Sequence, residues 1–335
     1  MSANAPKTIN VLMRHLRDDC GINISGSTKK LMLVNYGYYH GYKGYRFFNR
    51  RANTIPYTDF DQLVNVIEYD QSLKSALYSS IMLLEMTSKN IVLNKVATKL
   101  NDASFDAVYK EVMNDEQSNS NLRLKRLQLK DRIHSTLSKN YSFAMNSARK
   151  RHSKSSHEIM VSHFYNRGDE VPIWAIFEVI SLGDFATFCT CINAAVRKEV
   201  LESIDMLSST DTNYQLLSNI IFTVKSLRNA VAHNNVIFDA RFKDRDENNN
   251  VVSWITAETG ITGIKFNFLT DYLVLICVVL KKMKCNIADI VNTIDEYTKC
   301  INIVYHKLPT NIYTKIVSTD SRPKISDLKD YILKK

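Results

Sequence analysis

The chain has 335 residues and a formal net charge of +10, long enough for one large domain or two ordinary ones without disulfide staples. Hydrophobic residues make up 45% and charged residues 23%, which excludes a disordered or fibrous chain. Only nine glycines and five prolines interrupt it, so the composition predicts an all-α fold.

Two short amphipathic helices are expected first, at 8–20 and 25–35, with Gly21 ending one and Ser25 or Ser27 capping the other. A segment rich in tyrosine and glycine follows at 35–48 and predicts a turn-rich loop. Its rings either fix the loop to a helical core, which we favour, or stack on bases. In the second case the RNA contacts would come from Tyr38, Tyr39, Lys43 and Arg46.

Helical periodicity runs from Asp59 to Leu100 and predicts two helices. Asp59 or Asp61 would cap the first, and Asp70 or Ser72 would begin the second. Glu85 lies on the apolar side of the second predicted helix. It would pair with a cation, cap a neighbouring segment or belong to an active site.

The positive charge is concentrated after a polar loop at 114–121. Residues 121–154 hold ten Lys or Arg and one Asp, a net charge of +9. Such a one-sided cluster, in a helix and loop, favours contact with RNA over a merely solvated helix face or a membrane surface. The candidate RNA-binding residues here are Arg123, Lys125, Arg126, Lys130, Arg132, Arg149, Lys150, Arg151 and Lys154.

The rest of the chain again predicts helices. A helix begins at 171–174 and ends at Gly183, Asp184 caps another at 185–196, and a third spans 212–232. A charged break at 244–250 leads to an irregular or hairpin insertion near 251–268, followed by helices at 271–283 and 287–305. We therefore divide the chain into a helical domain, residues 1–250, and a helical extension, residues 251–335.

The six cysteines form no CxxC pair, and Cys189 and Cys191 would lie about 200° apart on a helix. We therefore expect no zinc or other metal site, no cofactor and a reducing, cytoplasmic location. The longest apolar run, 272–280, is too short to span a bilayer, and the first ten residues lack a signal pattern, so no membrane partner is expected.

The candidate catalytic residues are Arg228, Asn229 and His233, at the end of the helix predicted over 212–232. On an ideal helix Asn229 and His233 share a face, whereas Arg228 and His233 lie about 140° apart. Either the helix ends at His233, or the arginine side chain curls around it. Asn234 and Asn235 favour a helix end at this point.

An imidazole, with an ordinary pKa of about 6.5, can take a proton from a ribose 2′-hydroxyl or give one to a leaving 5′-oxygen. A guanidinium stabilises charge on the phosphoryl oxygens. This chemistry cleaves RNA by transesterification and gives a 2′,3′-cyclic phosphate. Because one motif supplies one histidine, we expect a homodimer that brings two copies together.

Four blocks resemble the abortive-infection (Abi) family of the AbiF/AbiD type, within the HEPN ribonuclease superfamily. Residues 227–234 (LRNAVAHN) resemble its Arg-x4-His motif, and 33–45 its "NYGYYN…NGYK" block. Residues 83–89 resemble its "IEM…K" helix, and 171–183 its "PLWV…TFG" block. Two positions depart: Val231 stands where relatives often have Cys, and 235–238 replaces a charged stretch.

The resemblance implies a HEPN-like helical bundle that cleaves RNA without metal at a dimeric site formed by Arg228, Asn229 and His233. It also implies phage defence by growth arrest and restraint by a small non-coding RNA. Two other interpretations stay open. One is a non-catalytic protein that works as a ribonucleoprotein with a small RNA, and the other is a protein-binding sensor with a degenerate site.

Overall fold

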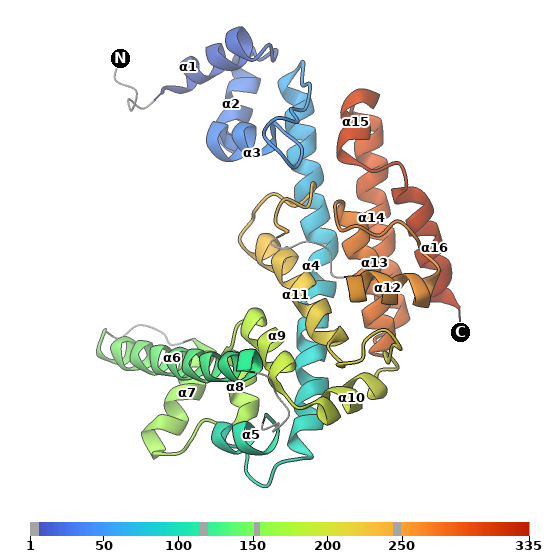
Figure 1. Ribbon diagram of the computed structural model, residues 1–335. Helices are drawn as coiled ribbons and strands as arrows, with labels where there is room; N and C mark the ends of the chain where they lie inside the picture. Colours follow the sequence, from blue (N-terminus) through green and yellow to red (C-terminus); the bar gives the residue numbers. More distant parts are fainter. Residues whose placement is uncertain (1–6, 114–119, 151–154, 244–248, 335) are drawn as a thin grey trace.

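A computed structural model describes residues 7–113, 120–150, 155–243 and 249–334, with side chains up to 146 in the second range. These ranges contain helices and no β-strand, so the predicted all-α fold is confirmed (Figure 1). One long helix, α4 (Phe60–Ala97), runs through the molecule. The first three helices lie at one of its ends and helices α5 to α9 at the other.

The prediction of two helices between Asp59 and Leu100 is wrong, because α4 is a single helix of 38 residues. Asp59 caps it as predicted: its carboxylate accepts from the backbone N–H of Asp61, and Gln62 completes a capping box. Asp70, expected to begin a second helix, is instead buried within α4. Its carboxylate binds partners from other parts of the chain, which a local capping pattern does not reveal.

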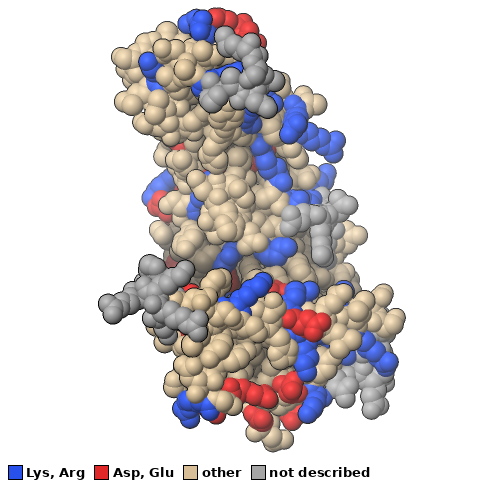
Figure 2. All heavy atoms as spheres, turned by 90° about the vertical axis from the view of Figure 1, so that its left-hand side faces the viewer, with Lys and Arg blue, Asp and Glu red and all other residues tan. Residues whose placement is uncertain are grey.

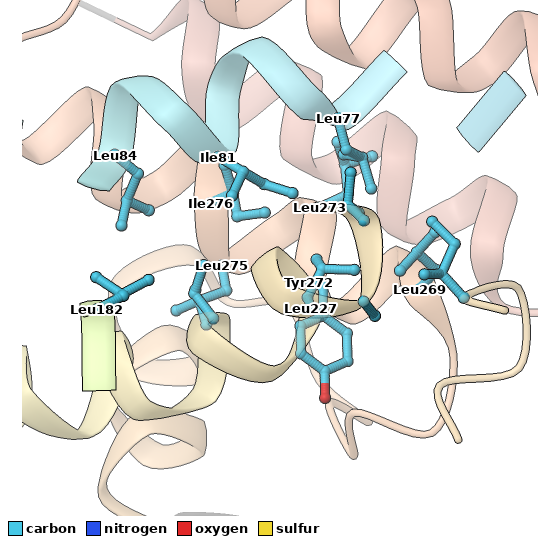
Figure 3. Close-up of a cluster of buried hydrophobic side chains, with 14 of the residues drawn as sticks. Leu77, Ile81, Leu84, Leu182, Leu227, Leu269, Tyr272, Leu273, Leu275 and Ile276 are labelled. Atoms are coloured by element: carbon cyan, nitrogen blue, oxygen red, sulfur yellow. The ribbon is translucent and has the colours of Figure 1, made fainter. Parts of the chain in front are cut away.

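The core lies where α4 crosses α11 (Leu216–Ala232) and α13 (Leu269–Lys282), with α9 (Leu182–Cys191) against its edge. Figure 3 shows leucine and isoleucine side chains of these four helices packed together. Leu77, Leu227 and Leu273 have no exposed surface. Burying each such side chain stabilises the fold by roughly 1.5–3 kcal/mol, so the helix that carries the motif is fixed by its apolar face.

The N-terminal part is helical from 26 to 45, so the prediction of a turn-rich loop at 35–48 is wrong except for residues 46–48, which are irregular. Its elements are α1 (Ile9–Arg14), η1 (His15–Asp19), α2 (Gly26–Tyr36), η2 (Gly37–Tyr42) and α3 (Lys43–Tyr45). Ser25 is the N-cap residue of α2, as expected. Tyr38, Tyr42 and Tyr45 are buried, so these rings do fix the segment to the core.

A second group of helices contains α5 (Phe105–Glu111), α6 (Ser120–Lys150), α7 (Ser156–Arg167), α8 (Ile173–Val179), α9 and α10 (Ala194–Ser203). Helix α6 packs on α7 and α9 and projects sideways from α4 (Figure 1). Gly183 does not end a helix, since it lies inside α9. Ser181 caps α9, where Asp184 was expected to do so. The loop expected at 114–121 lies mostly outside the described residues.

The C-terminal part contains α12 (Asn249–Thr259), α13, α14 (Ile287–Lys307), α15 (Thr310–Ile316) and α16 (Ser321–Leu333). The expected insertion at 251–268 is helical in its first half and irregular only after Gly260. Trp254 and Ile255 are buried, so packing determines this helix despite its β-branched residues. The division of the chain near residue 250 stays a prediction. Among the described helices none has the length and apolar character needed to cross a membrane.

Glu68 on α4 connects both ends of the chain. Its carboxylate accepts from Lys307 Nζ of α14 at 2.9 Å and from the Tyr36 hydroxyl of α2 at 3.0 Å. The hydrogen bond from Lys307 lowers the pKa of Glu68, partial burial raises it, and the Tyr36 bond lowers it again. The net effect is a pKa below the usual range. The carboxylate therefore stabilises the fold above pH of about 4.3 and loses that effect as the pH falls further.

We predict that Glu68→Gln lowers the free energy of unfolding at pH 7 and that the difference from the wild type shrinks below about pH 4. Urea unfolding followed by circular dichroism at both pH values measures it. Glu178, which is exposed on α8 and has no partner among the described residues, provides the matched control Glu178→Gln. A gap between wild type and Glu68→Gln that is constant with pH would contradict the prediction.

Candidate functional site

The three candidate catalytic residues lie in the last turn of α11 and at its end. His233 is the C-cap residue, with φ −98° and ψ 12°. The backbone N–H of Asn235 then donates to Ala230 O at 2.8 Å, and Asn234 has a left-handed φ of 53°. Asparagine tolerates this conformation, so the predicted helix end is confirmed. The sequence left two arrangements open, a helix that ends at His233 or an arginine side chain that curls around the helix. The structure shows the first of them.

Arg228 is held by a carboxylate of α4. Its Nε donates to Glu85 Oε2 at 3.0 Å, and Lys89 Nζ lies 3.1 Å from Glu85 Oε1. The guanidinium Nη1 also donates to Asn229 Oδ1 at 3.4 Å. Among the described residues, Nη2 has no partner. The arginine is 30% exposed and Glu85 only 13%, so one edge of the guanidinium is anchored and the other faces outwards.

His233 is exposed, and its imidazole has no hydrogen-bond partner within the described part of the chain. Its backbone N–H donates to Asn229 O at 3.0 Å, as the helix ladder requires, while the described residues show no side-chain hydrogen bond from His233 to Arg228 or Asn229. The structure thus brings Arg228 and Asn229 together and places His233 beyond them at the helix end. An open imidazole at the end of a helix whose last turn carries an anchored guanidinium can exchange a proton with a ligand whose anionic group the arginine holds.

The chain after His233 is fixed by Asp70, which is fully buried in α4. Asp70 Oδ1 accepts the backbone N–H groups of Ile237 and Phe238, both at 2.7 Å. Oδ2 accepts the Tyr45 hydroxyl at 2.8 Å and lies 2.7 Å from Lys74 Nζ. Burial and the neighbouring Asp70 charge raise the pKa of Tyr45, so this hydroxyl remains a donor.

Lys74 extends this network to the motif. Its Nζ donates to Asn234 Oδ1 at 2.9 Å while it pairs with Asp70. Asp70 therefore positions Asn234, the residue next to His233, through Lys74. It also holds the backbone of Ile237 and Phe238 directly through their N–H groups. The helix end that presents His233 is thereby tied to α4.

The basic residues of α6 divide into surface and packing positions. Lys125 is exposed. Lys130 pairs with Asp106 at 2.7 Å, and Arg132 pairs with Asp184 at 2.7 Å. Arg126 is only 5% exposed and its Nε donates to Cys191 O, so it packs α6 on α9 and is no surface contact for RNA.

Other candidate RNA-binding residues differ in their accessibility. Arg123 is exposed on α6. Tyr38 is 8% exposed, so the expectation that it offers a stacking surface is wrong, whereas Tyr39 is 64% exposed. Lys43 lies over the Tyr39 ring at 5.1 Å, and Arg46 lies 6.0 Å from the Tyr42 ring. The side chains of Arg149 and Lys150, together with Arg151 and Lys154, lie outside the described residues.

Figure 2 shows one face of the molecule, with Lys and Arg side chains along its middle and Asp and Glu near its lower end. The charge is therefore uneven on this face. Within the described ranges, no three His, Cys, Asp or Glu side chains gather so as to hold a metal ion.

The sequence did not reveal the contribution of Lys74 or Lys89 to the site, nor that Asn234 binds Lys74. Glu85 was noticed only because it breaks an apolar helix face, and its predicted pairing with a cation is confirmed by Arg228. A four-residue spacing of opposite charges, Asp70 to Lys74 and Glu85 to Lys89, was the available signal.

The fold and site define an all-helical protein that presents an Arg-Asn-x3-His helix end from a basic chain. The family model described as Abi-like protein matches residues 31–239, more than half of the chain and including the motif. The chain therefore belongs to the Abi-like protein family, whose membership suggests a role in abortive-infection phage defence. No curated protein and no solved structure matches it.

We predict that Asp70→Ala lowers the free energy of unfolding by about 3–5 kcal/mol, because it leaves Lys74 and two buried N–H groups without their acceptor. Urea unfolding monitored by circular dichroism measures the loss. Asp327→Ala removes an exposed carboxylate of α16 and should change the value by less than about 0.5 kcal/mol. Equal effects of the two substitutions would refute the role assigned to Asp70.

Proposed function

We propose that the protein is a metal-independent endoribonuclease of the HEPN superfamily and the AbiF/AbiD type, acting in the cytoplasm in abortive infection. Arg228, Asn229 and His233 are its catalytic residues. The observation that carries the proposal is the exposed His233 imidazole at the end of α11, five residues after an Arg228 guanidinium that Glu85 anchors. Membership of the Abi-like family supports the biological setting.

In the proposed reaction, the outer edge of the Arg228 guanidinium binds the nonbridging oxygens of the scissile phosphate. His233 takes the proton from the 2′-hydroxyl, whose oxygen attacks phosphorus, and the 5′-oxygen leaves with a proton. The products are a 2′,3′-cyclic phosphate and a 5′-hydroxyl. Asn229, within reach of Arg228 Nη1, holds the guanidinium in orientation. Fixing the charge in advance lowers the cost of reorganisation in the transition state.

A second general acid–base group comes, in this proposal, from a second copy of the chain. In a two-fold dimer the same surface meets itself, so an exposed helix end can place His233 near the partner's identical helix end. The open position of His233 is compatible with such an interface. We further propose that a small non-coding RNA binds the basic surface and restrains the activity.

We predict that His233→Ala and Arg228→Ala each lower the rate of RNA cleavage by at least about 100-fold and abolish growth arrest, because each removes a transition-state interaction. Cleavage of a labelled RNA, with detection of the cyclic phosphate end, measures the effect. His157→Ala, an exposed histidine of α7, is the matched control and should cut at the wild-type rate.

Circular dichroism should show the same helical content in all these variants. Wild-type rates in both Ala variants would refute the assignment of the site. RNA that is bound but never cut by the wild type, with affinity that falls steeply with salt, would favour the alternative of a non-catalytic ribonucleoprotein.

A further inference from the structure

A polar pocket lies away from the motif, where α6, α9 and α11 meet. Its volume is about 210 Å³. Helices α6 and α9 contribute residues three or four positions apart, which share one face of each helix, and α11 contributes one aromatic ring. The lining residues are Lys125, Gln128, Arg132, Thr187, Thr190 and Phe222. No residue of this pocket belongs to the proposed catalytic set.

The lining combines a cation, hydrogen-bonding groups and an aromatic ring. Lys125 is exposed and has no ion-pair partner among the described residues, so its ammonium can meet an anion. Arg132 is oriented by Asp184, which binds its Nε at 2.7 Å. Thr187 and Thr190 donate their protons to carbonyls within α9, which leaves their oxygens as acceptors. Phe222 is half-buried and packs against the core, so its ring is held in place.

Phosphate, sugar and base are the three parts of a nucleotide, and this lining has a partner for each. An ammonium and a guanidinium bind phosphate, hydroxyl and amide oxygens accept from ribose or base, and a ring stacks on a base. The pocket is small, with room for one nucleotide unit and none for a duplex. Single-stranded RNA, or a free nucleotide, has this chemistry.

A line of accessible residues connects the pocket to the motif. Phe222, Ser226, Asn229 and His233 follow one another at spacings of four, three and four along α11, so they share one face. Residues between them, such as Val224 and Leu227, are buried on the other side of the helix. Phe222 and His233 are about 16 Å apart along the helix axis. That length corresponds to about five stacked nucleotides, or fewer in a stretched strand.

Gly183 of α9 borders this line. A side chain at position 183 would press on Lys225, whose Cδ would lie 3.3 Å from the new Cβ. The absence of a side chain therefore lets the aliphatic part of Lys225 lie against α9, one turn of α11 beyond Phe222. This close approach places a further cation along the same face.

We propose that the pocket of Lys125, Arg132 and Phe222 binds one nucleotide of a single-stranded RNA. This nucleotide lies a few nucleotides along the strand from the phosphodiester that is cleaved at His233. The position of the nucleotide relative to the cleavage site rests on the proposed ribonuclease function. The binding of the nucleotide rests on the pocket alone. Phe222 and Lys125 are positioning residues: they hold the strand on the exposed face of α11 and leave the reacting atoms to the motif.

Binding is tested with the full chain and a fluorescein-labelled 12-nucleotide single-stranded RNA, by fluorescence anisotropy at fixed salt. Lys125→Glu and Phe222→Leu should each raise Kd about fivefold or more, since each removes a phosphate or base contact. Lys139→Glu, the same change on exposed α6 outside the pocket, is the matched control and should change Kd by less than about twofold. Leucine keeps the apolar volume at 222, and circular dichroism verifies the fold.

Cleavage of RNAs of different length tests the position of the pocket. For the 12-nucleotide RNA, Lys125→Glu and Phe222→Leu should lower kcat/KM through KM. For a dinucleotide, which is too short to reach the pocket, both variants should cut like the wild type. Displacement of the 12-nucleotide RNA by adenosine monophosphate at concentrations below the Kd of the RNA would identify a free nucleotide as the ligand of the pocket and refute the strand.

Two results overturn the proposal. One is an equal effect of Lys125→Glu and Lys139→Glu on RNA binding, which shows a diffuse charge effect. The other is a loss of dinucleotide cleavage in Phe222→Leu, which assigns the ring to the catalytic centre or to the fold. If the wild type cuts no RNA, the ribonuclease proposal fails, and the anisotropy measurements still decide whether the pocket binds the strand.

Discussion

A single buried carboxylate joins three parts of this protein that are far apart in sequence. Asp70, in the middle of α4, binds the hydroxyl of Tyr45, the ammonium of Lys74 and the backbone of Ile237 and Phe238. A charge at 0% exposure is tolerated only when its oxygens are fully used, and here four donors use them. The N-terminal helices, the long helix and the segment after the motif are thus fixed to one point.

The same long helix also holds the motif itself, about four turns further along from Asp70. The Glu85 carboxylate pairs with both Lys89 and Arg228, so the guanidinium is oriented by a residue 143 positions away in the chain. Asp70 and Glu85 of α4 both bind the segment 228–238: Glu85 binds the helix, and Asp70 binds the chain that follows it. An unbroken α4 is what gives the two carboxylates a constant separation, and a break between them would uncouple the arginine from the helix end.

The features that depend on neighbouring residues could be predicted from the sequence, and those that depend on packing could not. Asp59 caps α4, Ser25 stands at the N-cap position of α2 without a side-chain hydrogen bond, and Asn234 follows the end of α11. These local features are decided within a few residues. Arg126 and Tyr38 look like RNA contacts in a basic or aromatic stretch, yet both are buried, since the helices that cover them come from elsewhere. The motif residues are found by pattern, while their partner Glu85 needs the three-dimensional contact.

The position of α13 has a consequence for synthesis. Its twelve residues from Leu269 to Leu280 are all buried against α4 and its neighbours, as Figure 3 shows for several of them. A ribosome makes this helix after the motif helix, and the N-terminal part of a chain begins to fold first. The apolar face of α11 therefore lacks part of its cover until the last fifth of the chain has emerged. An incomplete chain therefore carries the motif on a helix whose hydrophobic contacts with α13 have not yet formed.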